Sequence, residues 1–142
     1  TMENVTLNIP KPIYEDMVAH AKEIAPIESC GYLSGQEGVI QTFFKMSNID
    51  NSPEHFTFDP KEQFGALKQA RSLGQKLLAV YHSHPASPAR LSEEDIRLFN
   101  DSEMVYIIVS LMGGNVDVKG FKVKKLEKET LVQSVTLVVQ EV

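Results

Sequence analysis

Residues 77–95 read LLAVYHSHPASPARLSEED, which predicts a buried strand, a tight loop and the first turn of a helix. His82 and His84 end this strand, and residues two apart on a strand point to the same face, about 6.6 Å apart along the chain. Their imidazoles can therefore converge on one cation. Ser92 and Asp95 form the Ser-x-x-acid pattern of a helix N-terminus. A chain that turns back there can direct the Asp95 carboxylate at the same ion.

Two histidines and one carboxylate leave the fourth position of a tetrahedral zinc ion to water, which is typical of catalytic rather than structural sites. Other metal patterns are excluded. The sequence has no His-Glu-x-x-His helix of a zincin, and no His-x-Glu with Pro-Cys-x-x-Cys of a zinc base deaminase. The single cysteine, Cys30, excludes an internal disulfide and a cysteine-based zinc site, and it fits a reducing compartment. The pattern predicts a site for hydrolysis.

The bulk composition narrows the class of protein. A chain of 142 residues with 42% hydrophobic residues predicts one domain, over residues 2–142. The net charge of −5 argues against a nucleic-acid surface, and the basic cluster at 119–128 is diluted by acids, which favours a solvated strand end. No run reaches the roughly 18 apolar residues of a membrane span, and the N-terminus lacks a signal-peptide pattern. We expect a cytoplasmic protein without a membrane segment.

Working outward from the central stretch, hydrophobic periodicity predicts one α/β domain with a mixed β-sheet flanked by helices. We expect a helix from Pro12 to Pro26 and another after Asp59, with Phe64, Leu67 and Ala70 as the buried stripe of the second. The expected strands lie near 5–9, before Gly35, and at 39–44, 56–58, 77–81, 104–112, 116–123 and 131–139, the last as an edge strand.

Other reactive side chains compete for a role. His20 and His55 have no partner at ligand spacing, so we expect both to be structural. Cys30 favours a small buried side chain over a nucleophile, because the promising histidines are better explained as ligands. Ser83 alternates with the two histidines and should pack on the opposite face. Glu28 starts a strand, and composition alone leaves an exposed acid as its plainest interpretation.

Three motifs together resemble the JAMM motif of the MPN domain metalloproteases: Glu-Ser-Cys-Gly at 28–31, His-Ser-His-Pro at 82–85 and Ser-x-x-Asp at 92–95. The order and spacing of the three motifs match the family pattern, and the similarity runs from the first predicted helix to the predicted strand after Gly114. The resemblance implies the MPN/JAMM fold, with its cytidine-deaminase-like architecture, and a metallopeptidase activity.

The resemblance also implies roles for the motif residues. His82, His84 and Asp95 would hold Zn²⁺, which would lower the pKa of its bound water towards 7. Glu28 would accept the proton of that water as general base and pass it to the leaving amine. Ser92 would donate a hydrogen bond to the oxyanion, a role that is compatible with capping a helix.

The short chain is similar to the minimal prokaryotic form, for which the resemblance implies hydrolysis after the C-terminal Gly-Gly of a small ubiquitin-like or sulfur-carrier protein. The bond can be a linear peptide, an isopeptide or an adduct with one amino acid such as cysteine. The carrier tail could add to a sheet edge, near Phe56 or at 104–112. Two alternatives stay open: a catalytically silent MPN scaffold for protein interactions, and a metal hydrolase in nucleic-acid repair, which the acidic balance disfavours.

Overall fold

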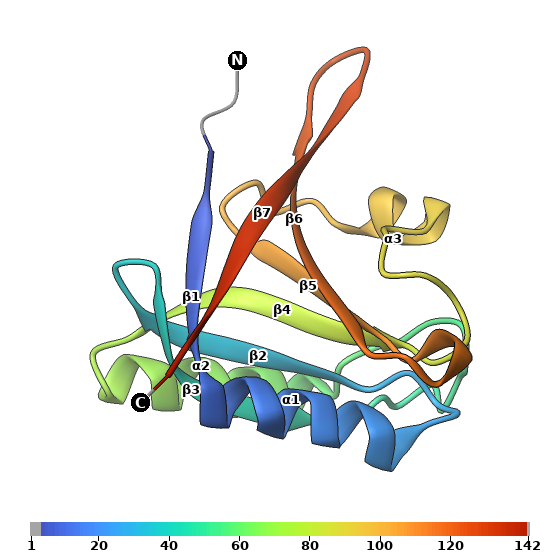
Figure 1. Cartoon of the computed structure of the whole chain (residues 1–142). Coiled ribbons are helices and arrows are strands. Elements are labelled where there is room, and N and C mark those ends of the chain that lie inside the picture. The colour runs from blue at the N-terminus through green and yellow to red at the C-terminus, as the bar shows by residue number, and fades with distance from the viewer. Residues whose placement is uncertain (1–3, 142) are drawn as a thin grey trace.

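One mixed sheet organises the computed structural model of the protein, which describes residues 4–141 (Figure 1). Its seven strands follow the order β1-β3-β2-β4-β5-β6-β7 and close into a barrel, because β7 pairs in parallel with β1 as well as antiparallel with β6. The strands are β1 Thr6–Pro10, β2 Cys30–Gln36, β3 Val39–Met46, β4 Lys76–His84, β5 Val105–Ser110, β6 Asp117–Lys125 and β7 Thr130–Gln140. The helices are α1 Lys11–Ile24, α2 Pro60–Ser72, α3 Glu93–Leu98 and the short 3₁₀ turn η1 Met112–Gly114.

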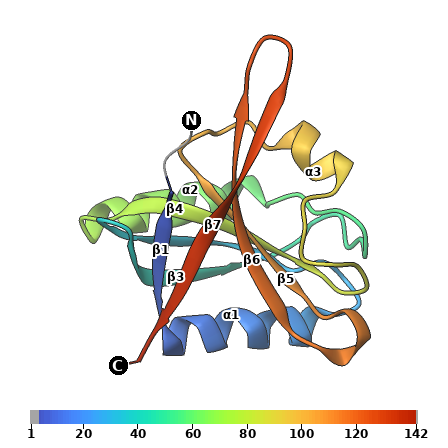
Figure 2. The same ribbon diagram turned by 45° about the horizontal axis from the view of Figure 1, so that its top comes forward.

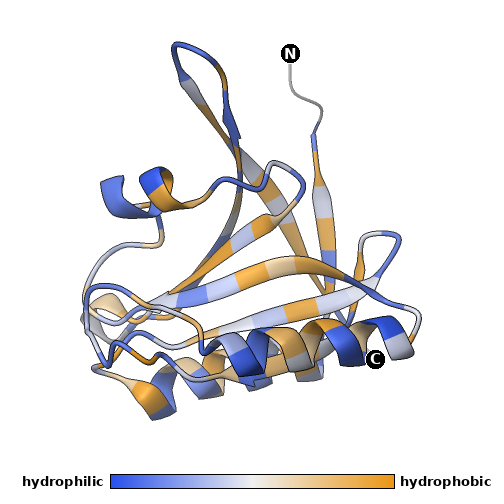
Figure 3. Cartoon of the chain, turned by 180° about the vertical axis from the view of Figure 1, so that it is seen from behind, coloured by the Kyte–Doolittle hydropathy of each residue, from blue (hydrophilic) through white to orange (hydrophobic). Residues whose placement is uncertain are grey.

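The parallel pair of β4 and β5 forms the buried centre of the sheet, as their apolar runs predict. All six residues of β5 are buried, and β4 is buried from Ala79 to His84. Both strands are rich in hydrophobic residues along most of their length (Figure 3). Two parallel strands need a crossover connection. Here the connection between β4 and β5 contains the loop 85–92, which follows the two histidines, and α3. The strand that holds both histidines is therefore fixed on its two sides, by β2 and by β5.

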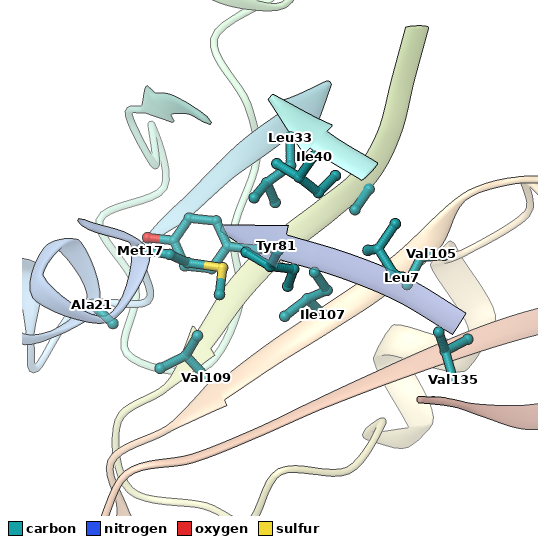
Figure 4. Packing of buried hydrophobic residues seen from close by; sticks show 12 residues of the cluster. Leu7, Met17, Ala21, Leu33, Ile40, Tyr81, Val105, Ile107, Val109 and Val135 are labelled. Carbon is teal, nitrogen blue, oxygen red and sulfur yellow. The ribbon is translucent and has the colours of Figure 1, made fainter. Parts of the chain in front are cut away.

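The main core lies between α1 and the inner face of the closed sheet (Figures 1 and 2). Met17 and Ala21 of α1 are fully buried and lie four residues apart, on one face of the helix. Figure 4 shows Tyr81 of β4 and Ile107 of β5 among the side chains gathered there. This packing holds β4 rigidly from the side that faces away from the histidine ligands.

The predicted buried stripe of α2 is wrong in two of its three positions. Phe64 is 69% exposed and Leu67 is 36% exposed, while Ala66 and Ala70 are buried. The carboxylate of Glu62 accepts hydrogen bonds from the backbone nitrogen and the hydroxyl of Ser47, at 2.7 and 3.0 Å. Residues four apart share a helix face, so this contact turns positions 62, 66 and 70 towards the sheet. Small side chains then fill the interface and the large ones face outward.

Three predictions about strand edges are also wrong. β7 is no edge strand, because its pairing with β1 closes the barrel. The segment 104–112 lies inside the sheet, since β5 pairs with both β4 and β6, so it offers no edge to a tail. Residues 56–58 form no strand and contribute one isolated bridge, between Asn48 and Phe58. Closure of a barrel depends on contacts between distant segments, which periodicity does not report. Among the described residues, no helix has the length and apolar character needed to cross a membrane.

Candidate metal centre

His82, His84 and Asp95 converge on one point at the end of β4, as their spacing predicts. The two Nε2 atoms lie 3.0 Å apart, and Asp95 Oδ2 lies 3.3 Å from His82 Nε2 and 3.2 Å from His84 Nε2. All three residues are buried. Two ligand atoms that each lie 2.0–2.1 Å from a tetrahedral ion are about 3.3 Å apart. The three atoms therefore have the separation that a small tetrahedral cation requires.

The surroundings of His84 and His82 keep both rings suitable as ligands. His84 Nδ1 lies 2.8 Å from the carbonyl oxygen of Pro88, so Nδ1 donates and Nε2 faces the centre. Burial acts to lower the pKa of His84, but its hydrogen bonds with Asp95 and Pro88 outweigh burial and raise that pKa, so a metal that binds displaces a proton from Nε2. The ring of His82 stacks on Phe56, with centroids 4.9 Å apart. Burial lowers the pKa of His82, which keeps this ring neutral. A neutral imidazole is the form that binds a metal.

Asp95 is placed by the start of α3. The Ser92 hydroxyl accepts a hydrogen bond from the Asp95 backbone nitrogen, and the Asp95 carboxylate accepts one from the Ser92 nitrogen, both at 3.0 Å. Burial acts to raise the pKa of Asp95, but hydrogen bonds from His82 and His84 outweigh it and hold that pKa well below the usual range. The carboxylate is therefore ionised and oriented before any ion arrives.

Glu28 is buried, which contradicts its plain interpretation as an exposed acid. It lies just before β2, is 4% exposed, and its Oε1 has no hydrogen-bond partner among the described residues. Burial raises the pKa of Glu28 to about 8, although the nearby positive charge of His84 acts in the opposite direction. A carboxyl group with a pKa near neutrality and a free oxygen suits proton transfer. The polar side chain is retained here despite the cost of burying it.

Ser83 points away from the metal side, as its alternation with the histidines predicts, and it is fully buried. Its role is more specific than packing. Ser83 Oγ accepts a hydrogen bond from the Ser29 nitrogen at 2.8 Å, and the Ser83 nitrogen donates to the Ser29 carbonyl at 3.0 Å. The residue after Glu28 is thus joined to the strand that carries both histidines.

The remaining candidates lie outside the ligand set. Cys30 is fully buried, and burial raises the pKa of its thiol to about 12, so the thiolate is strongly disfavoured. His20 is buried and hydrogen-bonded to the hydroxyl of Tyr81, a structural position. His55 is exposed, with Nδ1 3.0 Å from Asp50 Oδ2. The placements of Cys30 and His20 agree with the sequence interpretation, whereas His55 also lines a pocket beside the ligands.

A pocket of about 370 Å³ adjoins the ligands, and our sequence interpretation missed it. Asp95 is part of its wall, and Glu94 stands beside it. Half of the other lining residues are aromatic: Tyr32, Phe56, Phe58, Phe99 and Tyr106. These side chains come from β2, β5, the loop before α2 and the end of α3, so no local pattern brings them together. Their one sequence signal is the pair Phe56 and Phe58, which was interpreted as a strand.

A sequence profile of prokaryotic homologs of the JAB domain matches residues 10–123. The chain belongs to this family. It is 33% identical over 96 residues to the CysO-cysteine peptidase of Mycobacterium tuberculosis, a match that covers 66% of each chain. It is 30% identical over 108 residues to the desampylase of Pyrococcus furiosus, covering 76% of each chain. A protein of Desulfitobacterium hafniense with a solution structure is 37% identical, with a TM-score of 0.84 over 96% of this chain and 94% of that one.

These comparisons confirm the resemblance and the fold class expected from the sequence. They also confirm the enzyme class expected from the sequence, since the relatives bear the names of a peptidase and a desampylase and the matched profile is that of the JAB domain. The match spans about two thirds of the mycobacterial peptidase.

Proposed function

We propose that this chain is a zinc-dependent peptidase that hydrolyses the amide bond after the C-terminal Gly-Gly of a small ubiquitin-like or sulfur-carrier protein. One observation carries the proposal: His82, His84 and Asp95 converge within 3.3 Å of one another, with the buried carboxyl of Glu28 close enough for its pKa to respond to two of them. The names of the relatives, a CysO-cysteine peptidase and a desampylase, support a small protein conjugate as substrate.

His82, His84 and Asp95 would hold the zinc ion. Two neutral imidazoles and one ionised carboxylate are a donor set that Zn²⁺ accepts, and they leave one position open for water or substrate. Such an ion supplies a lowered pKa for water and polarises a carbonyl group. The protein contributes a ligand triangle that is already assembled, so little reorganisation is needed on binding.

Glu28 acts as general base and then as general acid. Its free oxygen takes a proton from the attacking water and passes it to the nitrogen of the leaving amine. Ser92 uses its hydroxyl oxygen as an acceptor in the helix cap, so its O–H remains available to donate to the oxyanion. Ser92 also orients the ligand Asp95, and the residue after Glu28 is bonded to the strand that carries both histidines.

The pocket beside Asp95 would hold the carrier tail. Its aromatic wall suits an apolar side chain of the tail, while Gly-Gly, which has no side chains, can lie close to the metal ligands. Phe56 lies outside every strand of the described residues, so the loop around it is the remaining candidate for backbone pairing with the tail. We expect this reaction in the cytoplasm, since the single cysteine fits a reducing compartment.

A panel of carriers tests the proposal and identifies the bond. Each carrier ends in Gly-Gly followed by one amino acid, a short peptide or a lysine-linked protein. We expect the zinc-loaded protein to release at least one extension, and chelation to stop the release. The silent scaffold is the alternative: it would bind a carrier without cleaving it, and it is disfavoured because none of the motif residues is replaced. Stoichiometric zinc with no cleavage of any carrier would contradict the proposal.

A further inference from the structure

Asn48 is a buried amide at the start of the loop between β3 and α2, and its side chain joins five backbone groups. Its Nδ2 donates to the carbonyl oxygens of Glu28, at 3.0 Å, His55, at 2.9 Å, and Ser52, at 3.5 Å. Its Oδ1 accepts from the backbone nitrogens of Asp50, at 3.0 Å, and Thr57, at 3.2 Å. The side chain therefore uses both donors and its acceptor, which leaves it no freedom to turn.

The groups that Asn48 joins belong to two parts of the site. Glu28 is the proposed base. His55 and Thr57 flank Phe56, whose ring lines the aromatic pocket and stacks on a metal ligand. A second link runs in parallel, because the Glu28 nitrogen donates to the Ser52 carbonyl at 2.9 Å. A displacement of the pocket wall is therefore transmitted to the backbone of Glu28.

The other side of Glu28 is fixed differently. Its neighbour Ser29 is bonded through both backbone groups to Ser83, inside the central strand. That strand is paired on both sides. Glu28 thus lies between an anchor inside the sheet, on β4, and an anchor on the loop 47–59, which belongs to no strand named above and carries part of the pocket wall.

We propose that Asn48 is a positioning residue that couples the pocket-lining segment 52–58 to Glu28, so that a tail held in the pocket fixes the Glu28 carboxylate for proton transfer. This inference rests on the proposed role of Glu28. Asn48 itself touches no reacting atom. Its effect comes through geometry, since a displacement of about 1 Å at a catalytic group lowers rates up to about 100-fold.

Two variants separate this role from a general effect on the loop. Asn48→Asp keeps the size of the side chain and its acceptor for Asp50 and Thr57, but loses the amide donor to Glu28 and to the loop carbonyls of His55 and Ser52. Asp50→Ala is the matched control for the loop. It removes the carboxylate that holds the Thr57 hydroxyl, at 2.5 Å, and the His55 ring, at 3.0 Å, and it leaves the bond from Asn48 to Glu28 in place.

We expect zinc-loaded Asn48→Asp to lose about 10- to 100-fold in kcat per folded molecule. Asp50→Ala loosens the pocket wall but keeps the donor to Glu28, so it is expected to raise KM and to lower kcat by much less than Asn48→Asp does. Equal losses of kcat in the two variants would contradict a specific role of Asn48. Zinc content and thermal unfolding of each variant show the folded fraction. If the whole loss in Asn48→Asp follows a lower folded or zinc-loaded fraction, Asn48 is only structural and the proposal is wrong.

Amide hydrogen exchange of the full zinc-loaded chain, without substrate, gives a second readout. The Glu28 amide should exchange at least about tenfold faster in Asn48→Asp, while the Ser83 amide, bonded to Ser29, keeps its rate. An unchanged rate at Glu28 would overturn the coupling. Asn48→Ala gives the same comparison if Asn48→Asp folds poorly. Because no carrier is needed here, failure of the wild type to cleave any carrier refutes the proposed function separately.

Discussion

The Ser92 hydroxyl oxygen and the Asp95 backbone nitrogen lie 3.0 Å apart, and the Asp95 carboxylate lies at the same distance from the Ser92 nitrogen. This reciprocal pair starts α3 and fixes the carboxylate that faces the two histidines. The hydroxyl oxygen serves as acceptor, so its proton is free for another partner. Helix capping and donation to an oxyanion are thus compatible in one side chain.

Ser92→Ala should therefore affect stability and catalysis to very different extents. The lost cap costs about 1 kcal/mol of unfolding free energy, whereas the lost oxyanion donor lowers kcat by about 100-fold or more. Ser92→Thr keeps both the acceptor and the donor and is expected to retain most of the activity. Urea unfolding and steady-state kinetics on equal amounts of zinc-loaded protein check this. A loss of kcat below about threefold in Ser92→Ala would remove the oxyanion role.

The buried carboxyl of Glu28 should make the metal-free protein less stable at alkaline pH. Its folded pKa is raised to about 8 by burial, while the unfolded chain has the ordinary value of 4.5. The unfolded state releases its proton first, so the wild type loses stability as pH rises from about 4.5 to about 8 and then levels off.

Glu28→Gln removes this titration. The unfolding free energy of Glu28→Gln should exceed that of the wild type by an amount that grows through the same pH window to a few kcal/mol. Urea unfolding at several pH values, in the presence of a chelator, measures it. The same substitution at the exposed Glu15 is the control. A stability difference that does not vary between pH 4.5 and 8 would show that Glu28 is not a buried acid with a raised pKa.

Zinc should stabilise the folded chain through the histidine pair. A ligand that binds only the folded state adds about 2.7 kcal/mol when its free concentration is 100 times its Kd. We expect zinc to raise the unfolding temperature of the wild type, and His82→Ala to abolish the increase. His55→Ala, which changes an exposed histidine outside the ligand set, should keep it. Equal responses in His82→Ala and the wild type would place zinc elsewhere.

The orientation of α2 predicts opposite effects at two apolar positions. Phe64 is 69% exposed, so Phe64→Ser should change the unfolding free energy by no more than about 0.5 kcal/mol. Ala70 is fully buried against the sheet, and Ala70→Leu should cost about 1–3 kcal/mol through overpacking. Denaturant unfolding of both variants measures these changes in unfolding free energy. A large loss in Phe64→Ser would restore the helix face expected from the sequence.

The motif residues were predictable because their spacing is local. His82 and His84 share a strand face, and Ser92 with Asp95 starts a helix, so short-range geometry brings these residues together. Glu28 needed the family resemblance, since its burial depends on contacts far along the chain, those of Glu28 with Ser52 and of its neighbour Ser29 with Ser83. The same reason explains why barrel closure by β7 and the aromatic pocket were missed. Both depend on pairings between distant segments, which local periodicity does not encode.

The first measurement we would make is the intact mass of a Gly-Gly carrier after incubation with zinc-loaded wild type and with zinc-loaded Glu28→Gln. Equal zinc content in the two proteins makes Glu28 the only difference between them. We predict that the wild type shortens the carrier to its terminal Gly-Gly, while Glu28→Gln leaves it intact over the same time. Equal cleavage by both proteins, or cleavage by the wild type at any other bond, would contradict the proposed mechanism.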